Sequence, residues 1–202
     1  ENQLSEFKTV LDLCHFIRDK KTRISPEIIN WAHILKDKVH IHIPKTGFSF
    51  NLFNFSYRAV FRSLFRLRAE GITNIPEGPC IIAANHQSFL DGFVVASLIR
   101  RTVMKKTYFY AKEKYWRRWW LKFLARKNNI ILMDINKDLK LSLQKMAAIL
   151  DKGKNLIIFP EGTRSLDGQV GEFKKTFAIL AHELHVPVVP VAINGADRLL
   201  PV

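Results

Sequence analysis

The sequence predicts an α/β fold with a mostly parallel central sheet, helices on both faces and a helical segment at the N-terminus. Three observations support this prediction. From residue 80 onward, short apolar runs of strand length alternate with segments of helical length. No repeat or low-complexity tract interrupts the alternation. The 202 residues are 48% hydrophobic, which is enough for one sizeable core.

The N-terminal part is expected to be helical. Residues 4–19 place most of their apolar side chains on one face of a helix. Ser25 and Pro26 form a typical helix start, an N-cap followed by a first-turn proline, for a second helix that runs to about Lys38. We assign residues 1–44 to a helical N-terminal segment or linker.

Possible metal ligands are few. Residues 39–43 alternate apolar and polar side chains, which predicts a strand with His40 and His42 on its solvated face. Cys14 and Cys80 lie far apart in apolar stretches, as core thiols of a reduced compartment do. No cluster has the spacing of a zinc site, so we expect no metal.

Residues 45–202 are assigned to the main domain, which begins with a basic amphipathic helix within 48–68, helical from Asn54 onward. Two interpretations of this helix are open. It packs on the core with its arginines outward, or it lies at a lipid interface with aromatic rings among acyl chains and arginines at phosphates. The arginines are Arg58, Arg62, Arg66 and Arg68.

The remaining elements form the core of the domain, residues 71–197. Apolar runs predict strands, and amphipathic segments predict helices between them. The expected strands are 80–84, 107–111, 130–133, 155–159 and 186–193, and the expected helices are 92–100, 115–126, 138–150 and 173–184.

The net charge of +14 points to an anionic partner. Fifteen Phe and four Trp accompany the basic residues, a composition that suits a lipid interface or single-stranded nucleic acid.

Residues 115–123 combine three Trp with Arg and Lys, as an interfacial anchor does. On one helix the three Trp cannot all face inward, so at least one is expected to be exposed. No apolar run of about 18 residues predicts a membrane span.

Two polar clusters follow predicted strands. NHQSFLDG occupies residues 85–92, directly after the strand at 80–84, and FPEGTRS occupies residues 159–165, at the end of the strand at 155–159. Parallel sheets bind ligands at the carboxyl ends of their strands. We therefore expect the two clusters to converge on one site.

In the first cluster, a turn can bring Asp91 beside the imidazole of His86. Asp91 would then fix the tautomer of the ring and stabilise the imidazolium, while His86 deprotonates a hydroxyl that attacks an acyl carbonyl. The alternative is a structural loop histidine with Asp91 as the N-cap of the next helix. A Ser88–His86 hydrolase pair has poor geometry because the two residues are too close in sequence.

In the second cluster, Gly162 permits a tight turn, Thr163 offers a hydroxyl donor and Arg164 suits phosphate oxygens. Glu161 could orient Arg164 or accept a hydrogen bond from a substrate hydroxyl. A structural turn with a surface Glu–Arg pair is the alternative.

Together, NHQSFLD and, about seventy residues later, FPEGTRS resemble the paired signature of the glycerolipid acyltransferase superfamily. The block VPVVPV at 186–191 resembles the proline-containing strand of that family, and residues 72–85 fit its usual lead-in. The resemblance covers about residues 71–197.

The resemblance implies an O-acyltransferase of phospholipid biosynthesis or remodelling. It would move a fatty acyl group from acyl-CoA or acyl carrier protein to a glycerol phosphate or lysophospholipid hydroxyl, peripherally on the cytoplasmic face of the membrane. His86 would be the base, Asp91 its partner, and Glu161, Gly162, Thr163 and Arg164 the acceptor-binding residues. No cofactor is implied.

One departure from the family pattern concerns the acceptor. The family's middle block usually continues from its Asp to an arginine that holds the acceptor phosphate, but here Asp134 is followed by Ile135 and Asn136. Either Lys137 or Arg164 compensates, or the acceptor is not a plain glycerol phosphate monoester.

Two other functional classes are open. A catalytically degenerate lipid-surface binding module would explain the missing arginine, and a nucleic-acid-binding protein would explain the charge but neither motif, so no nucleic acid is expected. The chain begins at Glu1 without an initiator Met, and we expect it to belong to a longer polypeptide, for which an acyl-activating ligase is one candidate neighbour.

Overall fold

The computed structural model describes residues 30–37, 39, 43, 48–113, 116–133, 137–165 and 167–197. The chain divides into two units, residues 1–31 and 32–202, and nearly all described residues belong to the second. The helix predicted over 4–19 lies outside the described residues, as do His40 and His42 and most of the strand predicted over 39–43.

Five parallel strands form the central sheet, in the order β3-β2-β4-β1-β5. The predicted parallel sheet is therefore confirmed. The two strands β1 and β4 are apolar except for Asn155, because both their faces are covered, and Ile81, Ile82, Leu156 and Ile157 are almost fully buried. The strands are β1 (Ile81–Ala84), β2 (Thr107–Lys112), β3 (Ile130–Met133), β4 (Asn155–Ile158) and β5 (Val188–Val191).

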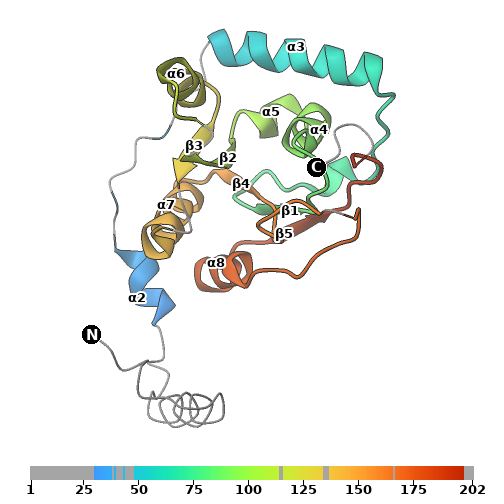
Figure 1. Cartoon of the computed structure of the whole chain (residues 1–202). Helices are drawn as coiled ribbons and strands as arrows, with labels where there is room; N and C mark the ends of the chain where they lie inside the picture. The colour runs from blue at the N-terminus through green and yellow to red at the C-terminus, as the bar shows by residue number, and fades with distance from the viewer. Residues whose placement is uncertain are drawn as a thin grey trace, which may run out of the picture. The chain divides into compact units, whose positions relative to one another are not determined.

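Helices cover both faces of this sheet, as predicted. Figure 1 shows α4 and α5 on one face and α7 and α8 on the other. A short 3-10 turn, η2 (Ile72–Asn74), precedes β1. The helices are α2 (Trp31–Lys36), α3 (Phe48–Leu64), α4 (Asp91–Leu98), α5 (Arg101–Met104), α6 (Trp119–Lys127), α7 (Leu139–Asp151) and α8 (Thr176–Leu184).

Several predicted helix boundaries differ from the observed ones, in two cases because a residue at the end of the helix has an extended backbone conformation. The helix predicted over 92–100 ends at Leu98 because Ile99 adopts an extended conformation, and α5 follows as a separate short helix that was not predicted. The helix predicted from residue 115 begins only at Trp119, since Arg118 before it is extended. The helix predicted from residue 173 begins at Thr176.

The basic amphipathic helix also has different limits. α3 begins at Phe48, earlier than the predicted Asn54, and ends at Leu64, after which Arg66 adopts a left-handed conformation with φ 46°. One face of α3 is packed against the core through Phe50 and Phe61, which are 2% and 7% exposed. A second face stays in solvent. Among the described residues, no helix has both the length and the apolar content needed to span a bilayer.

Candidate active site

The two polar clusters meet at the carboxyl edge of the sheet. β1 and β4 are neighbours in parallel register, with Ile81 opposite Leu156, so the loops that follow them emerge side by side. The backbone N–H of Ser165 donates to the carbonyl oxygen of His86 at 2.7 Å, which joins the loops directly. The convergence predicted from the sequence is confirmed.

His86 and Asp91 form a hydrogen-bonded pair. Their Nδ1 and Oδ2 atoms lie 2.9 Å apart, and the Asp91 side chain is fully buried whereas 22% of the His86 side chain is exposed. The same Oδ2 accepts hydrogen bonds from the backbone N–H groups of Gln87 (2.6 Å) and Ser88 (2.8 Å). Three donors thus fix a buried carboxylate beside the imidazole, which offsets the cost of burying its charge.

Asp91 does not cap the following helix from the N-cap position. It is the first residue of α4, Leu90 holds the N-cap position, and that cap has no side-chain hydrogen bond. The carboxylate binds N–H groups of the loop that precedes the helix. The capping alternative is therefore wrong, and the turn serves to bring Asp91 to His86.

The ring of His86 is held in plane by Phe159. The two rings stack with centroids 4.2 Å apart and planes 19° from parallel. Because the Asp91 carboxylate only accepts, the proton between the two side chains belongs on Nδ1, which leaves the lone pair of the neutral ring on Nε2. No hydrogen bond to Nε2 occurs within the described part of the chain. Nε2 is thus available to accept a proton.

Glu161 connects three segments around the site. Its side chain is buried, and Oε1 accepts from the backbone N–H of His86 at 2.8 Å while Oε2 accepts from that of Gly171 at 3.1 Å. A Cβ atom at Gly171 would lie only 3.2 Å from Oε2, so glycine permits this approach. No ion pair joins Glu161 to Arg164 in the structure.

Arg164 lies over an aromatic ring of the other cluster. Its guanidinium carbon is 3.5 Å from the centroid of the Phe89 ring, within the range of cation–π attraction. Gly162 has φ 70°, a left-handed conformation that fits the tight turn expected at this glycine, and Thr163 is exposed. Arg164 therefore borders the His86 loop, and no ion pair with a described carboxylate occupies its guanidinium group.

Lys112 is a site residue that sequence reasoning missed. It ends β2, the strand on the other side of β4, and its Nζ lies 3.4 Å from the carbonyl oxygen of Gly162. Its position at the carboxyl end of a predicted strand was the available signal. Lys137 is exposed, and residues 134–136, where the family arginine is missing, lie outside the described residues.

Asn85 joins the site to the edge strand. Its side-chain nitrogen donates to the carbonyl oxygen of Ile193 at 2.9 Å, and its oxygen accepts from the backbone N–H of Ile193 at 2.6 Å. This double contact fixes the chain just past β5 against the end of β1. Within the described residues, no group of three or more His, Cys, Asp or Glu side chains could hold a metal ion.

The fold is a parallel α/β sheet that carries a His–Asp pair and an arginine-bearing loop at its carboxyl edge, and an acyltransferase is the class of protein that this combination indicates. The acyltransferase family model matches residues 66–194, and the chain belongs to this family.

Curated relatives agree with this assignment. The chain is 30% identical over 168 residues to the chloroplastic 1-acyl-sn-glycerol-3-phosphate acyltransferase BAT2 of Brassica napus, a match that covers 81% of this chain and 45% of the relative. It is 34% identical over 138 residues to the 1-acyl-sn-glycerol-3-phosphate acyltransferase of Pseudomonas aeruginosa, covering 65% of this chain and 51% of that protein. The chain thus spans about half the length of these relatives.

A solved structure shares the fold. The crystal structure of the 1-acyl-sn-glycerophosphate acyltransferase PlsC from Thermotoga maritima superposes with a TM-score of 0.56 at 29% identity, covering 75% of this chain and 61% of that one.

Proposed function

We propose that the chain transfers a fatty acyl group from a thioester to a hydroxyl of a glycerol phosphate or lysophospholipid, with lysophosphatidate as the first acceptor to test. The observation that carries this proposal is the His86–Asp91 pair, at 2.9 Å, at the carboxyl edge of the sheet. The names of the relatives, which are 1-acyl-sn-glycerol-3-phosphate acyltransferases, support the acceptor class.

His86 acts as the general base in this proposal. Its Nε2 takes the proton of the acceptor hydroxyl as the hydroxyl oxygen forms a bond to the thioester carbonyl carbon. The tetrahedral intermediate then expels the thiolate, which takes the proton back from the imidazolium. Asp91 stabilises the imidazolium between these two steps, as its buried carboxylate and short contact with Nδ1 favour.

The phosphate of the acceptor is held by Arg164 with Lys112. Arg164 lies beside the His86 loop, and Lys112 reaches the backbone of Gly162 from the neighbouring strand. Two cations on this side of the site compensate for the arginine that the family has after Asp134. Thr163 supplies a further donor, and Glu161 acts by positioning the His86 backbone.

The donor is a thioester of coenzyme A or acyl carrier protein, and the chain works peripherally at an anionic membrane on its cytoplasmic face. The net charge of +14 favours such a surface. Trp119, Trp120 and Phe123 of α6 are 80%, 46% and 59% exposed beside Lys and Arg residues, as in interfacial segments. The prediction that at least one of these Trp residues is exposed is confirmed.

The test is thioester turnover by the His86→Ala variant, with labelled acyl-CoA and acyl carrier protein and a panel of acceptors. We expect a fall in kcat/KM of roughly 10²–10⁴-fold. His182→Ala is the matched control, because His182 is an exposed histidine on α8, 83% exposed at its side chain, and should leave the rate unchanged.

Unchanged turnover in His86→Ala would contradict the mechanism. A wild-type chain that binds anionic vesicles but turns over no thioester with any acceptor would instead support the lipid-surface binding module, the alternative that the missing arginine favours.

A further inference from the structure

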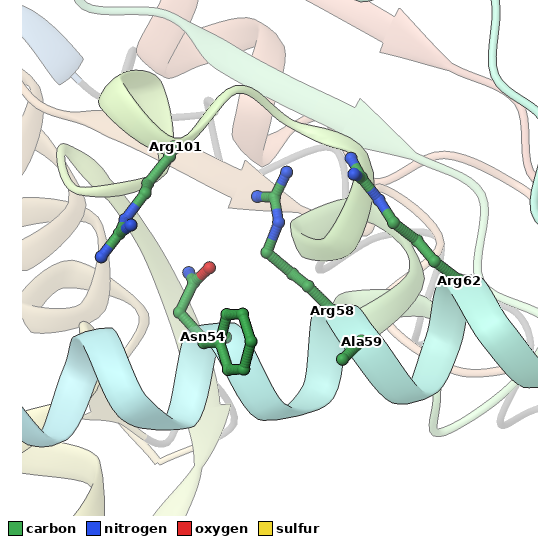
Figure 2. A pocket seen from close by; sticks show the side chains of 6 residues that line it. Asn54, Arg58, Ala59, Arg62 and Arg101 are labelled. Atoms are coloured by element: carbon green, nitrogen blue, oxygen red, sulfur yellow. The ribbon is translucent and has the colours of Figure 1, made fainter.

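A second basic site lies away from the catalytic loops, between α3 and the start of α5. It is a pocket of about 230 Å³ (Figure 2). Arg58 and Arg62 rise from α3 on one side, and Arg101 descends from α5 toward the same helix. The lining residues are Asn54, Phe55, Arg58, Ala59, Arg62 and Arg101.

No carboxylate that the structure describes balances the charge of the three arginines. No ion pair joins any of them to a carboxylate within the described residues. Partial burial lowers the pKa of Arg58, and the charges of Arg62 and Arg101 nearby lower it further. A bound anion would offset the repulsion among the three guanidinium groups.

Internal hydrogen bonds hold two of the arginines in place. Nη1 of Arg58 donates to the carbonyl oxygens of Ile99 at 2.7 Å and Ala96 at 3.3 Å, just after α4 and in its last turn. Nη2 of Arg101 donates to Oδ1 of Asn51 at 3.2 Å. Each guanidinium carries five N–H donors, so donors remain for a ligand in a fixed geometry that suits phosphate oxygens.

An exposed apolar stripe on α3 borders the pocket. Phe48, Leu52, Phe55 and Ala59 are four or three residues apart and share one helix face, with the three larger side chains 84%, 57% and 69% exposed. Phe55 and Ala59 belong both to the stripe and to the pocket wall. The same helix therefore offers N–H groups that can donate hydrogen bonds to a phosphate. Directly beside them it offers an apolar surface that no residue described by the structure covers.

We propose that this pocket binds the headgroup phosphate of an anionic membrane phospholipid whose acyl chains lie along the apolar stripe of α3. A lipid is the ligand that joins a phosphate to a long apolar chain, which is the pairing that the pocket and stripe present. The site is separate from acyl transfer and does not depend on it. It also resolves the two interpretations of this helix, since one face packs on the core and another meets lipid.

The experiment measures binding of the chain to phosphatidylglycerol-containing vesicles and to neutral phosphatidylcholine vesicles. The test variant is Arg62→Gln/Arg101→Gln, which spares Arg58 because Arg58 also holds α4. The matched control is Arg66→Gln/Arg68→Gln, which removes the same charge just beyond the end of α3 from exposed arginines that do not line the pocket. We expect the test variant to lose roughly tenfold or more in affinity for the anionic vesicles and the control to lose less than threefold.

Equal losses in the two variants would overturn the proposal, because they would show a diffuse charge effect. Unchanged circular dichroism and thermal unfolding establish that both variants are folded, and thioester turnover with a detergent-dispersed acceptor should be unchanged in both. If Arg58→Lys is added as a third variant, it should retain the fold and weaken vesicle binding, since lysine keeps the charge without the planar fork.

Two soluble probes test which phosphate the pocket takes. A short-chain phosphatidylglycerol below its aggregation threshold should bind the wild-type chain and lose affinity in Arg62→Gln/Arg101→Gln. Inorganic phosphate should bind at least tenfold more weakly, because it lacks the chain that would contact the stripe. Equal affinity for inorganic phosphate, or preferential binding of a single-stranded oligonucleotide at the same arginines, would overturn the assignment to lipid.

Discussion

His86 is held by contacts with three residues, one from its own loop and two from the loop that follows β4. Asp91 binds Nδ1, Phe159 stacks on the ring, and Glu161 accepts from the backbone N–H. Each contact fixes a different degree of freedom: the tautomer, the ring plane and the loop position. In the proposed mechanism these contacts keep the His86 ring in one rotamer and one tautomer. Changing each partner should therefore have a different effect on turnover.

Replacing Asp91 with Asn should separate charge from geometry. The Asn side-chain oxygen can still accept from Gln87 and Ser88, but the neutral group no longer stabilises an imidazolium. We expect kcat to fall by about 10²–10⁴-fold with an unchanged circular dichroism spectrum. Full activity in Asp91→Asn would show that the carboxylate charge takes no part in the reaction.

Glu161→Gln should reveal positioning of His86. One of the two backbone N–H groups, of His86 or Gly171, would then face an amide donor instead of a carboxylate oxygen. The free energy of unfolding should fall by about 1–3 kcal/mol, the usual cost of an unsatisfied buried group, and kcat should fall while the KM for the acceptor stays the same. Glu172→Gln, an exposed neighbour, is the control. A raised KM with unchanged kcat would favour the substrate-binding role that the sequence suggested for Glu161.

At the scale of single elements, α7 shows how local sequence signals and tertiary packing combine. Asp138 caps it by accepting from the backbone N–H of Leu141 at 2.8 Å, and Leu143, Met146 and Ile149 bury its inner face. The amphipathic pattern predicted a helix over 138–150, within one residue of the observed bounds, and the Asp138 cap is a local interaction that fixes its start. The predicted starts of α6 and α8 were too early because no comparable cap marks them.

Removing the cap of α7 should therefore have a defined cost. Asp138→Ala should lower the free energy of unfolding by about 1 kcal/mol, measured by urea denaturation. Asp138→Asn should retain most of the stability because an Asn side chain can also accept at the N-cap. Equal losses in the two variants would mean that the charge of Asp138, rather than its hydrogen bond, stabilises the helix.

α6 provides the second element-scale test. Trp119 and Phe123 lie one turn apart on this helix and are 80% and 59% exposed, whereas Trp116 precedes the helix and is partly buried. Trp119→Ser/Phe123→Ser should weaken flotation with anionic vesicles because two interfacial side chains are lost. Leu139→Ser/Val170→Ser removes two exposed apolar side chains elsewhere and should have no effect. Equal flotation of both variants would leave α3 as the membrane contact.

At the scale of the whole molecule, the strand sequence and the convergence of the two polar loops could be predicted because they follow from hydrophobic periodicity and from parallel topology. The contacts that complete the site could not. The contacts of Glu161 with His86, of Arg164 with Phe89 and of Lys112 with Gly162 depend on the order of strands in the sheet. That order places β4 between β1 and β2 through long-range packing, which no local pattern encodes.

The buried centre of the sheet can be probed through Cys80, which precedes β1 and is fully buried. Burial raises the pKa of its thiol from 9.0 to about 11. In a Cys14→Ser background, alkylation of the native chain should be at least ~10³-fold slower than alkylation of the urea-unfolded chain, since the thiol reacts only when the core opens.

The pH dependence of stability follows from the raised pKa of the Cys80 thiol. Between pH 9 and about 11 the unfolded chain loses the thiol proton while the folded chain retains it, so the free energy of unfolding should fall as pH rises through this window and should not respond to this thiol below it. Cys80→Ala should flatten that part of the profile. Rapid alkylation of native Cys80 would mean that the strands around β1 open independently of the rest of the sheet. A profile that Cys80→Ala leaves unchanged would mean that folding does not raise the pKa of this thiol.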